Sequence, residues 1–195
     1  MPDAALLIRP SREADLGAIS RIYGHAVAHG TGTFEIEPPG QAEMVRRRAD
    51  LLALGLPWLV AERGAAVLGY ACAGVFRPRP AYRHCVEDSI YLDASARGHG
   101  VGRLLLAELL ARCEAWGARQ VLAVIGDSAN AGSIGAARRY SEAPYPQRCR
   151  NSSMAATASS LFPLARARLV TPSRAKNRRP SASPVSAVSA CRSAR

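Results

Sequence analysis

The chain has 195 residues, 48% of them apolar, and a formal net charge of +11 at pH 7. This length and apolar content suit one folded domain and exclude a chain that is disordered throughout. No run approaches about 18 uninterrupted apolar residues, and the N-terminus lacks a basic segment followed by an apolar one, so we expect a cytoplasmic protein without a membrane span.

Apolar runs separated by Gly and Pro predict alternating strands and helices over the first two thirds of the chain. The expected elements, in chain order, are a strand at 5–10, helices at 14–28 and 41–54, strands at 58–62, 67–76 and 85–92, a helix at 101–116 and a strand at 120–125. This order predicts a mixed-sheet α/β domain. The basic run Arg46-Arg47-Arg48 is interpreted as the solvated face of its helix.

A glycine-rich turn, Arg97-Gly98-His99-Gly100-Val101-Gly102, joins the strand at 85–92 to the next helix. Glycines let backbone N–H groups point into a concavity, and a helix N-terminus adds unpaired donors and the positive end of its dipole. The turn therefore suits a pyrophosphate, with an ordinary strand-to-helix turn as the alternative. A P-loop is excluded because neither Lys nor Ser/Thr follows, and a Rossmann motif because no βαβ unit surrounds the turn.

The pattern Arg97-x-x-Gly100-x-Gly102 resembles the acyl-CoA pyrophosphate loop of the GNAT superfamily of acetyl-CoA-dependent N-acetyltransferases. Within that superfamily, the chain looks like enzymes of the phosphinothricin N-acetyltransferase type over essentially residues 5–135. The other matching stretches, in the right order, are 8–10 with Asp15, 32–35, 57–62, 76–82, 86–87 with 89–92, and 124–134.

The resemblance implies a GNAT-type fold, a mixed and mostly antiparallel sheet flanked by helices, here without the last strands of the family. It implies acetyl-CoA as co-substrate, no metal, and a splayed gap between the strands at 85–92 and 120–125 where the thioester enters. The residues that it assigns to acetyl-CoA are the backbone of Ile90, Tyr91 and Leu92, the turn Arg97, Gly98, His99, Gly100, Val101 and Gly102, and Asn130.

Acetyl transfer needs an unprotonated amine next to the thioester carbonyl, a base and a donor for the oxyanion. Adjacent strand residues point to opposite faces, so either Glu87 or Asp88 faces the cleft. The resemblance places the general base at Glu87; a solvated strand residue is the alternative. A backbone N–H of the strand, that of Tyr91 or Leu92, would polarise the thioester carbonyl.

The acceptor candidates lie on two loops. Arg77 and Arg79 match positions near the amino-acid site of the family, and guanidinium groups suit a carboxylate or phosphinate. Two solvated loop arginines are the alternative. Phe34, Glu35 and Tyr82 complete the candidates for acceptor binding. The Cys and His residues show no convincing metal-ligand spacing, so we expect reduced thiols and no metal.

The resemblance stops after Gly135, where the family continues with Leu-His, a helix, a Leu-Gly-Phe turn and two strands. All 16 glycines lie in residues 1–136, which carry no net charge, and the whole surplus of +11 lies in residues 137–195. We interpret 1–136 as a C-terminally incomplete acetyltransferase domain and 137–195 as a disordered basic tail that is translated out of frame. We therefore expect an unpaired edge on the strand at 120–125 and impaired activity.

Three alternative functions are consistent with these observations. The first is acetylation of the α-amine of a small amino-acid analogue such as phosphinothricin, methionine sulfoximine or methionine sulfone. The second is acetylation of another amine, including a protein N-terminus. The third is a basic, non-catalytic protein associated with nucleic acid through its tail. The expected partners are a small-molecule amine and a second copy of the chain, with no membrane and only non-specific nucleic-acid contact.

Overall fold

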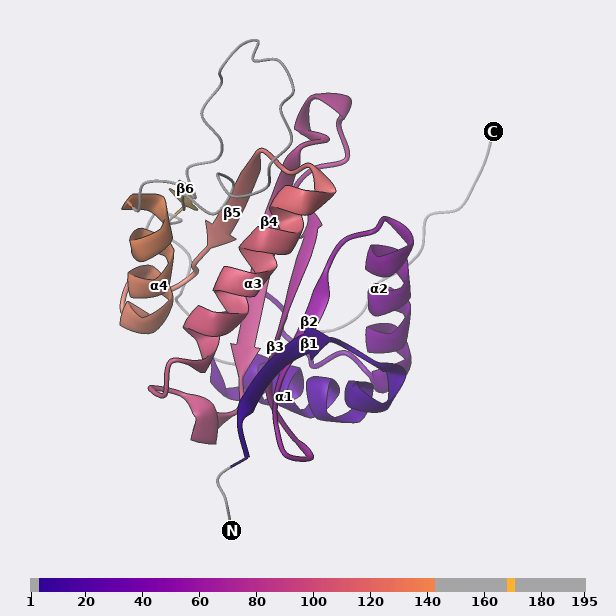
Figure 1. Ribbon diagram of the computed structural model, residues 1–195, viewed down its shortest axis with the longest axis vertical. Helices are drawn as coiled ribbons and strands as arrows, with labels where there is room; N and C mark the ends of the chain where they lie inside the picture. The colour runs from indigo at the N-terminus through magenta and orange to yellow at the C-terminus, as the bar shows by residue number, and fades with distance from the viewer. Residues whose placement is uncertain (1–3, 143–167, 171–195) are drawn as a thin grey trace, which may run out of the picture.

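The computed structural model of the chain describes residues 4–142 and 168–170 (Figure 1). A six-stranded sheet forms the centre, with its strands in the order of the sequence. The strands are β1 (Leu6–Pro10), β2 (Trp58–Arg63), β3 (Ala66–Val75), β4 (Cys85–Leu92), β5 (Gln120–Val124) and β6 (Arg168–Val170). β1 to β4 pair antiparallel, whereas β5 pairs parallel to both β4 and β6. The predicted mixed α/β fold is confirmed, and its strands up to β5 agree with the predicted ranges within one residue at each end.

β6 corrects the expectation of an unpaired edge on β5. Leu122–Val124 pair with Arg168–Val170, so the prediction was wrong over these three residues. A parallel ladder uses backbone groups that every non-proline residue has, so the Arg-rich composition of the tail gave no sign of it. The rest of the tail, residues 143–167 and 171–195, lies outside the described residues, and so does the prediction that it is disordered.

Within the described part of the chain, four helices flank the sheet: α1 (Leu16–His29), α2 (Gln41–Ala53), α3 (Val101–Trp116) and α4 (Ala131–Glu142). Short turns of 3-10 helix precede α1 (Glu13–Asp15), β4 (Pro80–Tyr82) and α3 (Ala94–Ala96). The first three helices agree with the predicted ranges within two residues at each end, but α4 was not predicted. The change in composition at residue 136 falls inside α4, so this boundary of composition is not a boundary of secondary structure. No helix among the described residues is long and apolar enough to cross a membrane.

The two faces of the sheet bury two separate apolar clusters, with α3 on one face and α1 and α2 on the other (Figure 1). β2 contributes to both because its side chains alternate. Leu59 and Ala61 lie in the cluster under α3, whereas Trp58 and Val60 lie in the cluster under α1 and α2. β4 alternates between the same two faces, which decides where its functional side chains lie.

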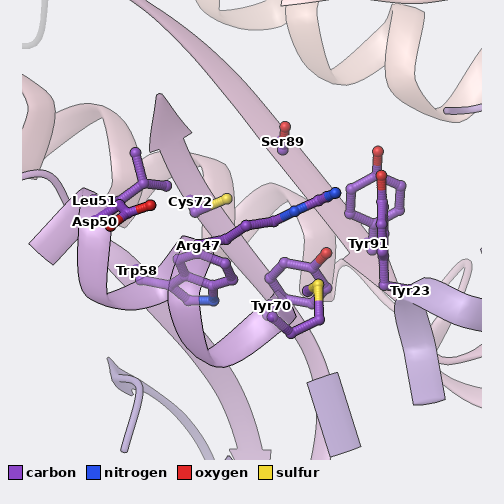
Figure 2. Close-up of a pocket in the computed structure, with 10 residues that line it drawn as sticks. Tyr23, Arg47, Asp50, Leu51, Trp58, Tyr70, Cys72, Ser89 and Tyr91 are labelled. Carbon is purple, nitrogen blue, oxygen red and sulfur yellow. The ribbon is translucent and has the colours of Figure 1, made fainter. Parts of the chain in front are cut away.

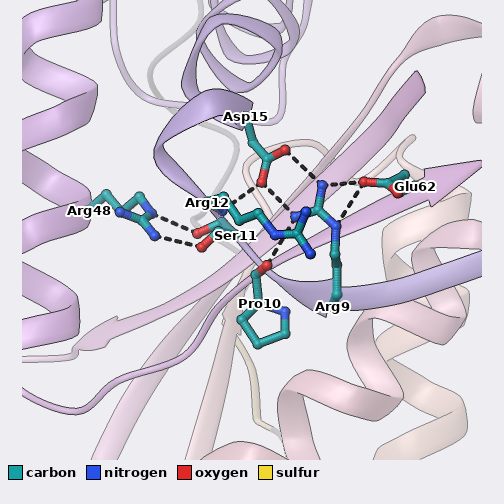
Figure 3. Close-up of polar contacts among 7 residues, drawn as sticks. All are labelled: Arg9, Pro10, Ser11, Arg12, Asp15, Arg48 and Glu62. Carbon is teal, nitrogen blue, oxygen red and sulfur yellow. Dashed lines mark hydrogen bonds and ion pairs between the residues drawn. The ribbon is translucent and has the colours of Figure 1, made fainter. Parts of the chain in front are cut away.

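Arg9 ties the start of α1 to the sheet (Figure 3). Its guanidinium donates to both carboxylate oxygens of Asp15, at 2.7 and 2.8 Å, and through Nε to Oε2 of Glu62 at 2.8 Å. The backbone N–H of Arg12 also donates to Asp15, at 2.6 Å. The hydrogen bonds from Arg9 hold the pKa of the Asp15 carboxyl below its usual range. This network explains why the sequence pairs Arg9 with Asp15: it positions the helix behind the candidate site.

Candidate functional site

β4 and β5 run side by side over only part of their length. Cys85–Asp88 pair with Gln120–Ala123, whereas residues 89–92 pair with β3 and have no strand partner on the other side among the described residues. We call this divergence the fork; its closed end is the pair Asp88–Ala123. The four unpaired residues span about 13 Å, at about 3.3 Å per residue.

The backbone groups of even-numbered β4 residues face the fork. The carbonyl of His84 accepts hydrogen bonds from the residues that begin β5, whereas the carbonyl of Cys85 accepts one from the residue that follows β3. Hydrogen-bonding groups of successive strand residues point to opposite edges. The N–H and C=O of Ile90 and Leu92 therefore face the fork, and those of Tyr91 face β3.

The side chains of β4 divide between the two faces of the sheet. Ser89 and Tyr91 line a pocket on the α1–α2 face, and Glu87 shares that face by alternation. Asp88 points to the α3 face, where Ile90 and other even-numbered residues pack against the core. Of the two adjacent carboxylates, Glu87 is therefore the one on the side of the pocket.

The glycine turn forms a cradle of backbone donors at the open end of the fork. Gly98 and Gly100 have φ values of +79° and +78°, a left-handed conformation that other residues rarely adopt. The N–H groups of Arg103 and Leu104 both donate to the carbonyl of Gly100, at 3.1 and 3.2 Å. The N–H groups of Val101 and Gly102 are therefore the unpaired donors of the first helical turn. The donors and the helix dipole suit a pyrophosphate. A Cβ on Gly102 would lie 3.3 Å from the side chain of Leu92, which explains the third small residue.

The other predicted contacts to acetyl-CoA lie in the glycine turn and at the start of α4. Arg97 and His99 are exposed in the same turn, and Nδ1 of His99 lies 2.8 Å from the carbonyl oxygen of Arg97. Asn130 precedes α4, where its Oδ1 accepts a hydrogen bond from the N–H of Ser133 at 3.1 Å. Asn130 thus acts as the N-cap of α4, with its side-chain NH2 group remaining as a donor.

A pocket of about 270 Å3 opens on the α1–α2 face (Figure 2). Aromatic rings form its wall: Tyr70 stacks on Trp58 and on Tyr91, with ring centroids 5.8 and 5.5 Å apart, and Tyr23 meets Tyr91 edge to face at 4.8 Å. The side chain of Arg47 extends across the pocket from α2 toward Ser89 and Tyr91 (Figure 2). The pocket therefore offers an aromatic wall and the cation of Arg47; Glu87 lies on the same face of the sheet but is not among the residues that line the pocket.

The three consecutive arginines of α2 have different surroundings. Arg46 is exposed and pairs with carboxylates of its own helix, whereas Arg48 is half-buried and donates to Ser11 Oγ at 2.8 Å. Arg47 donates to Glu35 at 2.6 Å and to a second glutamate at 2.8 Å. The prediction of a solvated face was therefore wrong for Arg47 and Arg48. Helical spacing contained the signal, because Arg47 lies three residues after the buried Met44, on the same face.

The loop between α1 and α2 closes one side of the pocket. The hydroxyl of Tyr91 donates to the carbonyl of Gly32 at 3.3 Å, and that of Tyr23 lies 3.1 Å from Thr33 Oγ1. The same loop carries Glu35, which its ion pair with Arg47 holds at the pocket, and Phe34, whose ring is 68% exposed.

The loop between β3 and β4 carries the remaining acceptor candidates. Arg77 and Arg79 are exposed; the guanidinium of Arg77 lies 5.1 Å from the ring centroid of Phe76. Tyr82 packs edge to face on the same ring and is 38% exposed. Arg77, Arg79 and Tyr82 do not line the pocket, so the structure brings Glu35 and Arg47 together but not these three.

Burial changes the acidity of both carboxyls at the fork. It raises the pKa of Glu87. Burial, together with the negative charge of Glu87, raises the pKa of Asp88 to about 6. Such shifts adapt carboxyls to proton transfer near neutral pH. The described residues hold no group of three His, Cys, Asp or Glu side chains placed to bind a metal.

Comparison with known proteins agrees with the acetyltransferase family that the sequence motifs resemble. Residues 24–141 match the Acetyltransferase (GNAT) family. Phosphinothricin N-acetyltransferase from Alcaligenes faecalis is 51% identical over 131 residues, which cover 67% of this chain and 66% of that protein. An L-methionine sulfoximine/L-methionine sulfone acetyltransferase from Pseudomonas aeruginosa is 40% identical over 136 residues, 68% of this chain and 77% of its own.

A solved structure extends the comparison to the fold. The crystal structure of a GNAT superfamily phosphinothricin acetyltransferase from Sinorhizobium meliloti, in complex with AcCoA, superposes with a TM-score of 0.67 and 46% identity. The superposition covers 69% of this chain and 73% of that chain. The matches to two curated phosphinothricin N-acetyltransferases span 66% and 64% of the length of those proteins, just under two thirds.

Proposed function

The chain belongs to the GNAT acetyltransferase family, and we propose that it transfers the acetyl group of acetyl-CoA to the α-amine of a small amino-acid analogue. Phosphinothricin and methionine sulfoximine or sulfone are the acceptors named for its relatives. The observation that carries the proposal is the fork, because it leaves an edge of β4 open for acetyl-CoA, while the side chains on the α1–α2 face remain for the acceptor. A cradle of backbone donors lies at its open end, and Glu87 lies at its closed end.

Acetyl-CoA would supply the acetyl group and would be held by the backbone of this chain. Gly98 to Gly102 provide donors for a pyrophosphate. Ile90 and Leu92 direct their N–H and C=O groups into the fork, where an extended amide-containing arm finds partners like those of a neighbouring strand. The N–H of Ile90 is the donor nearest the closed end and is suited to the developing oxyanion. The N–H of Tyr91, one of the two sequence candidates, points toward β3.

The acceptor would bind on the α1–α2 face of the sheet, at the pocket. Glu87 removes a proton from its amine, for which a raised pKa is favourable. Arg47 would pair with the carboxylate or phosphinate of the acceptor, since two glutamates fix its guanidinium. The aromatic wall would exclude water from the reacting groups. Holding both substrates in this way contributes to rate by positioning.

Because of the tail, we expect a lower turnover than that of the relatives. The chain leaves the family pattern after Gly135, in the middle of α4, and β6 pairs over three residues only. We propose that acetyl-CoA binds normally while turnover stays below that of the relatives. Translating the other two reading frames after codon 135 tests the origin of the tail: a Leu-His and Leu-Gly-Phe pattern in one of them would support a change of frame. The turnover of a chain with that frame restored then tests the effect of the tail on activity.

The compartment and the assembly belong to the same proposal. The thiols of Cys72, Cys85 and Cys113 are free, which fits the reducing cytoplasm. A homodimer is tested by light scattering coupled to size-exclusion chromatography; a mass of one chain would contradict it.

The proposed function is tested by acceptor-dependent thiol release from acetyl-CoA, with calorimetric binding of acetyl-CoA as a second readout. We expect release with phosphinothricin or methionine sulfone, and none with peptides of matched N-terminal residue. Release with peptides alone would assign the second function. Failure to bind acetyl-CoA, together with strongly salt-dependent binding of nucleic acid, would overturn the proposal in favour of the third.

A further inference from the structure

Asp88 is a carboxylate with an unsatisfied oxygen in the interior. Its Oδ1 atom is buried and has no hydrogen-bond partner among the described residues. A buried carboxyl oxygen without a partner is costly, so one that persists calls for a functional reason. The Arg9 network shows how this chain satisfies a buried carboxylate when the role is structural: Asp15 has an arginine and a backbone N–H. Asp88 has neither.

Asp88 lies where the two substrates of the proposed reaction meet. The pair Asp88–Ala123 closes the fork, and the glycine cradle lies at the far end, beyond Leu92. An arm that runs from the cradle along residues 89–92, about 13 Å of strand, ends at Asp88. The side chain emerges on the α3 face, opposite that of Glu87. The two carboxyls therefore flank the end of the arm, one on each face of the sheet.

The surroundings of Asp88 favour its neutral form. The titratable groups that act on it or feel its charge are Glu87 beside it, Cys72 from β3 and Cys113 from α3. Burial raises the pKa of both thiols to about 12, so they are neutral. Among the described residues, no basic side chain is one of the groups that act on the charge of Asp88. With a pKa near 6, its carboxyl retains a proton at a pH where an exposed aspartate has lost it.

We propose that Asp88 is the acid that delivers a proton to the sulfur of coenzyme A as the thioester breaks. The inference rests on the proposed acetyltransferase function and deepens it. The nitrogen of the free amine bonds to the carbonyl carbon, and the carbon–sulfur bond breaks with its electron pair left on sulfur. Glu87 takes a proton from the nitrogen, and Asp88 gives one to the sulfur. Solvent then removes the proton from Glu87 and returns one to Asp88, so both carboxyls are restored.

The first test needs no turnover. The thiol pKa of bound coenzyme A is measured by ultraviolet titration, as the difference between the complexes with coenzyme A and with desulfo-coenzyme A. A thiol titrates at a pH well above 6, where Asp88 is ionised. In the wild type, the negative charge of Asp88 next to the sulfur raises the pKa of the coenzyme A thiol. Asp88→Asn removes this like charge and lowers the pKa of the thiol by roughly one unit. Asp88→Ser is the second variant, and Glu114→Gln, an exposed carboxylate of α3, is the control that leaves the thiol unchanged.

The second test uses acetyl donors made from thiols of decreasing basicity. Asp88→Asn reduces turnover with acetyl-CoA by roughly tenfold, and the deficit disappears as the leaving thiol needs less help from an acid. An unchanged thiol pKa in both Asp88 variants, or a deficit that is equal for all donors, would overturn the inference while leaving the proposed function intact. If neither the wild type nor a variant binds acetyl-CoA, the proposed function fails, and the inference fails with it.

Discussion

Along the open edge of β4 and at the start of α3, the candidate site for acetyl-CoA is built from backbone groups, whereas on the α1–α2 face the candidate acceptor site is built from charged and aromatic side chains. Gly98 and Gly100 expose N–H groups in left-handed turns, while Arg47 and stacked aromatic rings line the pocket. A backbone site depends on conformation and tolerates changes of charge nearby. A side-chain site depends on charge and tolerates small shifts of the backbone. The two faces should therefore respond to different substitutions.

The largest effect is expected on the acceptor face. Glu87→Gln removes the base and lowers kcat by roughly 10² to 10⁴, with the Kd for acetyl-CoA unchanged. Because burial raises the pKa of Glu87, kcat/KM of the wild type rises with pH through a value above the usual 4.5 of a glutamate, where the base loses its proton. Steady-state kinetics against pH check this. A variant that keeps the wild-type turnover and the same rising limb would remove Glu87 from the mechanism.

The next effect concerns the helix behind the acceptor face. Asp15→Asn leaves the Arg9 guanidinium without its main partner and lowers the free energy of unfolding by about 3 kcal/mol at pH 7. The folded-state pKa of Asp15 is lowered, so its contribution is present above the ordinary value and is lost as pH falls through the folded value. Urea unfolding at neutral and acid pH measures both. Glu108→Gln, in a half-exposed pair of α3, is the control with little effect; equal losses would contradict the account.

The matching change on the backbone face is Gly100→Val. Forcing a branched residue to a φ of +78° costs about 2 kcal/mol. The free turn relaxes to avoid this strain, so acetyl-CoA has to restore the strained turn when it binds. A cost of about 2 kcal/mol corresponds to roughly 30-fold weaker binding of acetyl-CoA. Calorimetry gives the Kd, and the KM of the acceptor should not change. Gly17→Ala is the control, since that glycine has open space around its Cβ position. A larger effect on the acceptor than on acetyl-CoA would invert the comparison.

Arg47→Met should change the acceptor side alone. Losing one charge-assisted pair with a carboxylate or phosphinate raises the acceptor KM about tenfold, with the Kd for acetyl-CoA unchanged. Arg46→Met, which removes an exposed neighbour on the same helix, is the matched control and should leave both constants unchanged. If the two variants behave alike, Arg47 has no part in acceptor binding.

The smallest effect is a gain in stability. The folded-state pKa of Asp88 is raised to about 6 from 3.8, so its ionisation opposes folding above pH 6 and has no effect below the unfolded value. Asp88→Asn should therefore raise the free energy of unfolding by about 1 kcal/mol at pH 7, less than the shift alone gives because the amide also lacks partners. The gain should vanish at pH 3. A loss of stability at pH 7 would mean that Asp88 has a structural partner.

The strands and the glycine turn could be predicted because each depends on local order, whereas the choice of Glu87 over Asp88 rested on the family resemblance. Alternation along β4 separates Glu87 from Asp88, and glycines next to a helix start signal unpaired donors. The pairing of Arg47 with Glu35 could not be predicted, since it joins positions 12 residues apart through the fold of a loop. The isolation of Asp88 depends on where β5 leaves β4, which is a property of two strands whose paired residues lie 35 positions apart in the sequence.

The C-terminal part shows a different limit. α4 was missed because its sequence crosses the change to Arg- and Ala-rich composition, which carries little apolar periodicity. β6 was missed because three residues of parallel ladder need no particular side chains. Composition thus predicted where the family pattern ends but not where secondary structure ends.

Site-resolved amide hydrogen exchange, followed by NMR with acetyl-CoA alone, tests the division of β4 most directly. We predict that acetyl-CoA slows exchange at Ile90 and Leu92 and at residues 98–102, whose N–H groups face the fork or the cradle. Tyr91, whose N–H already faces β3, should not change. Slowing at Tyr91 but not at its two neighbours, or no slowing along the fork, would contradict the account.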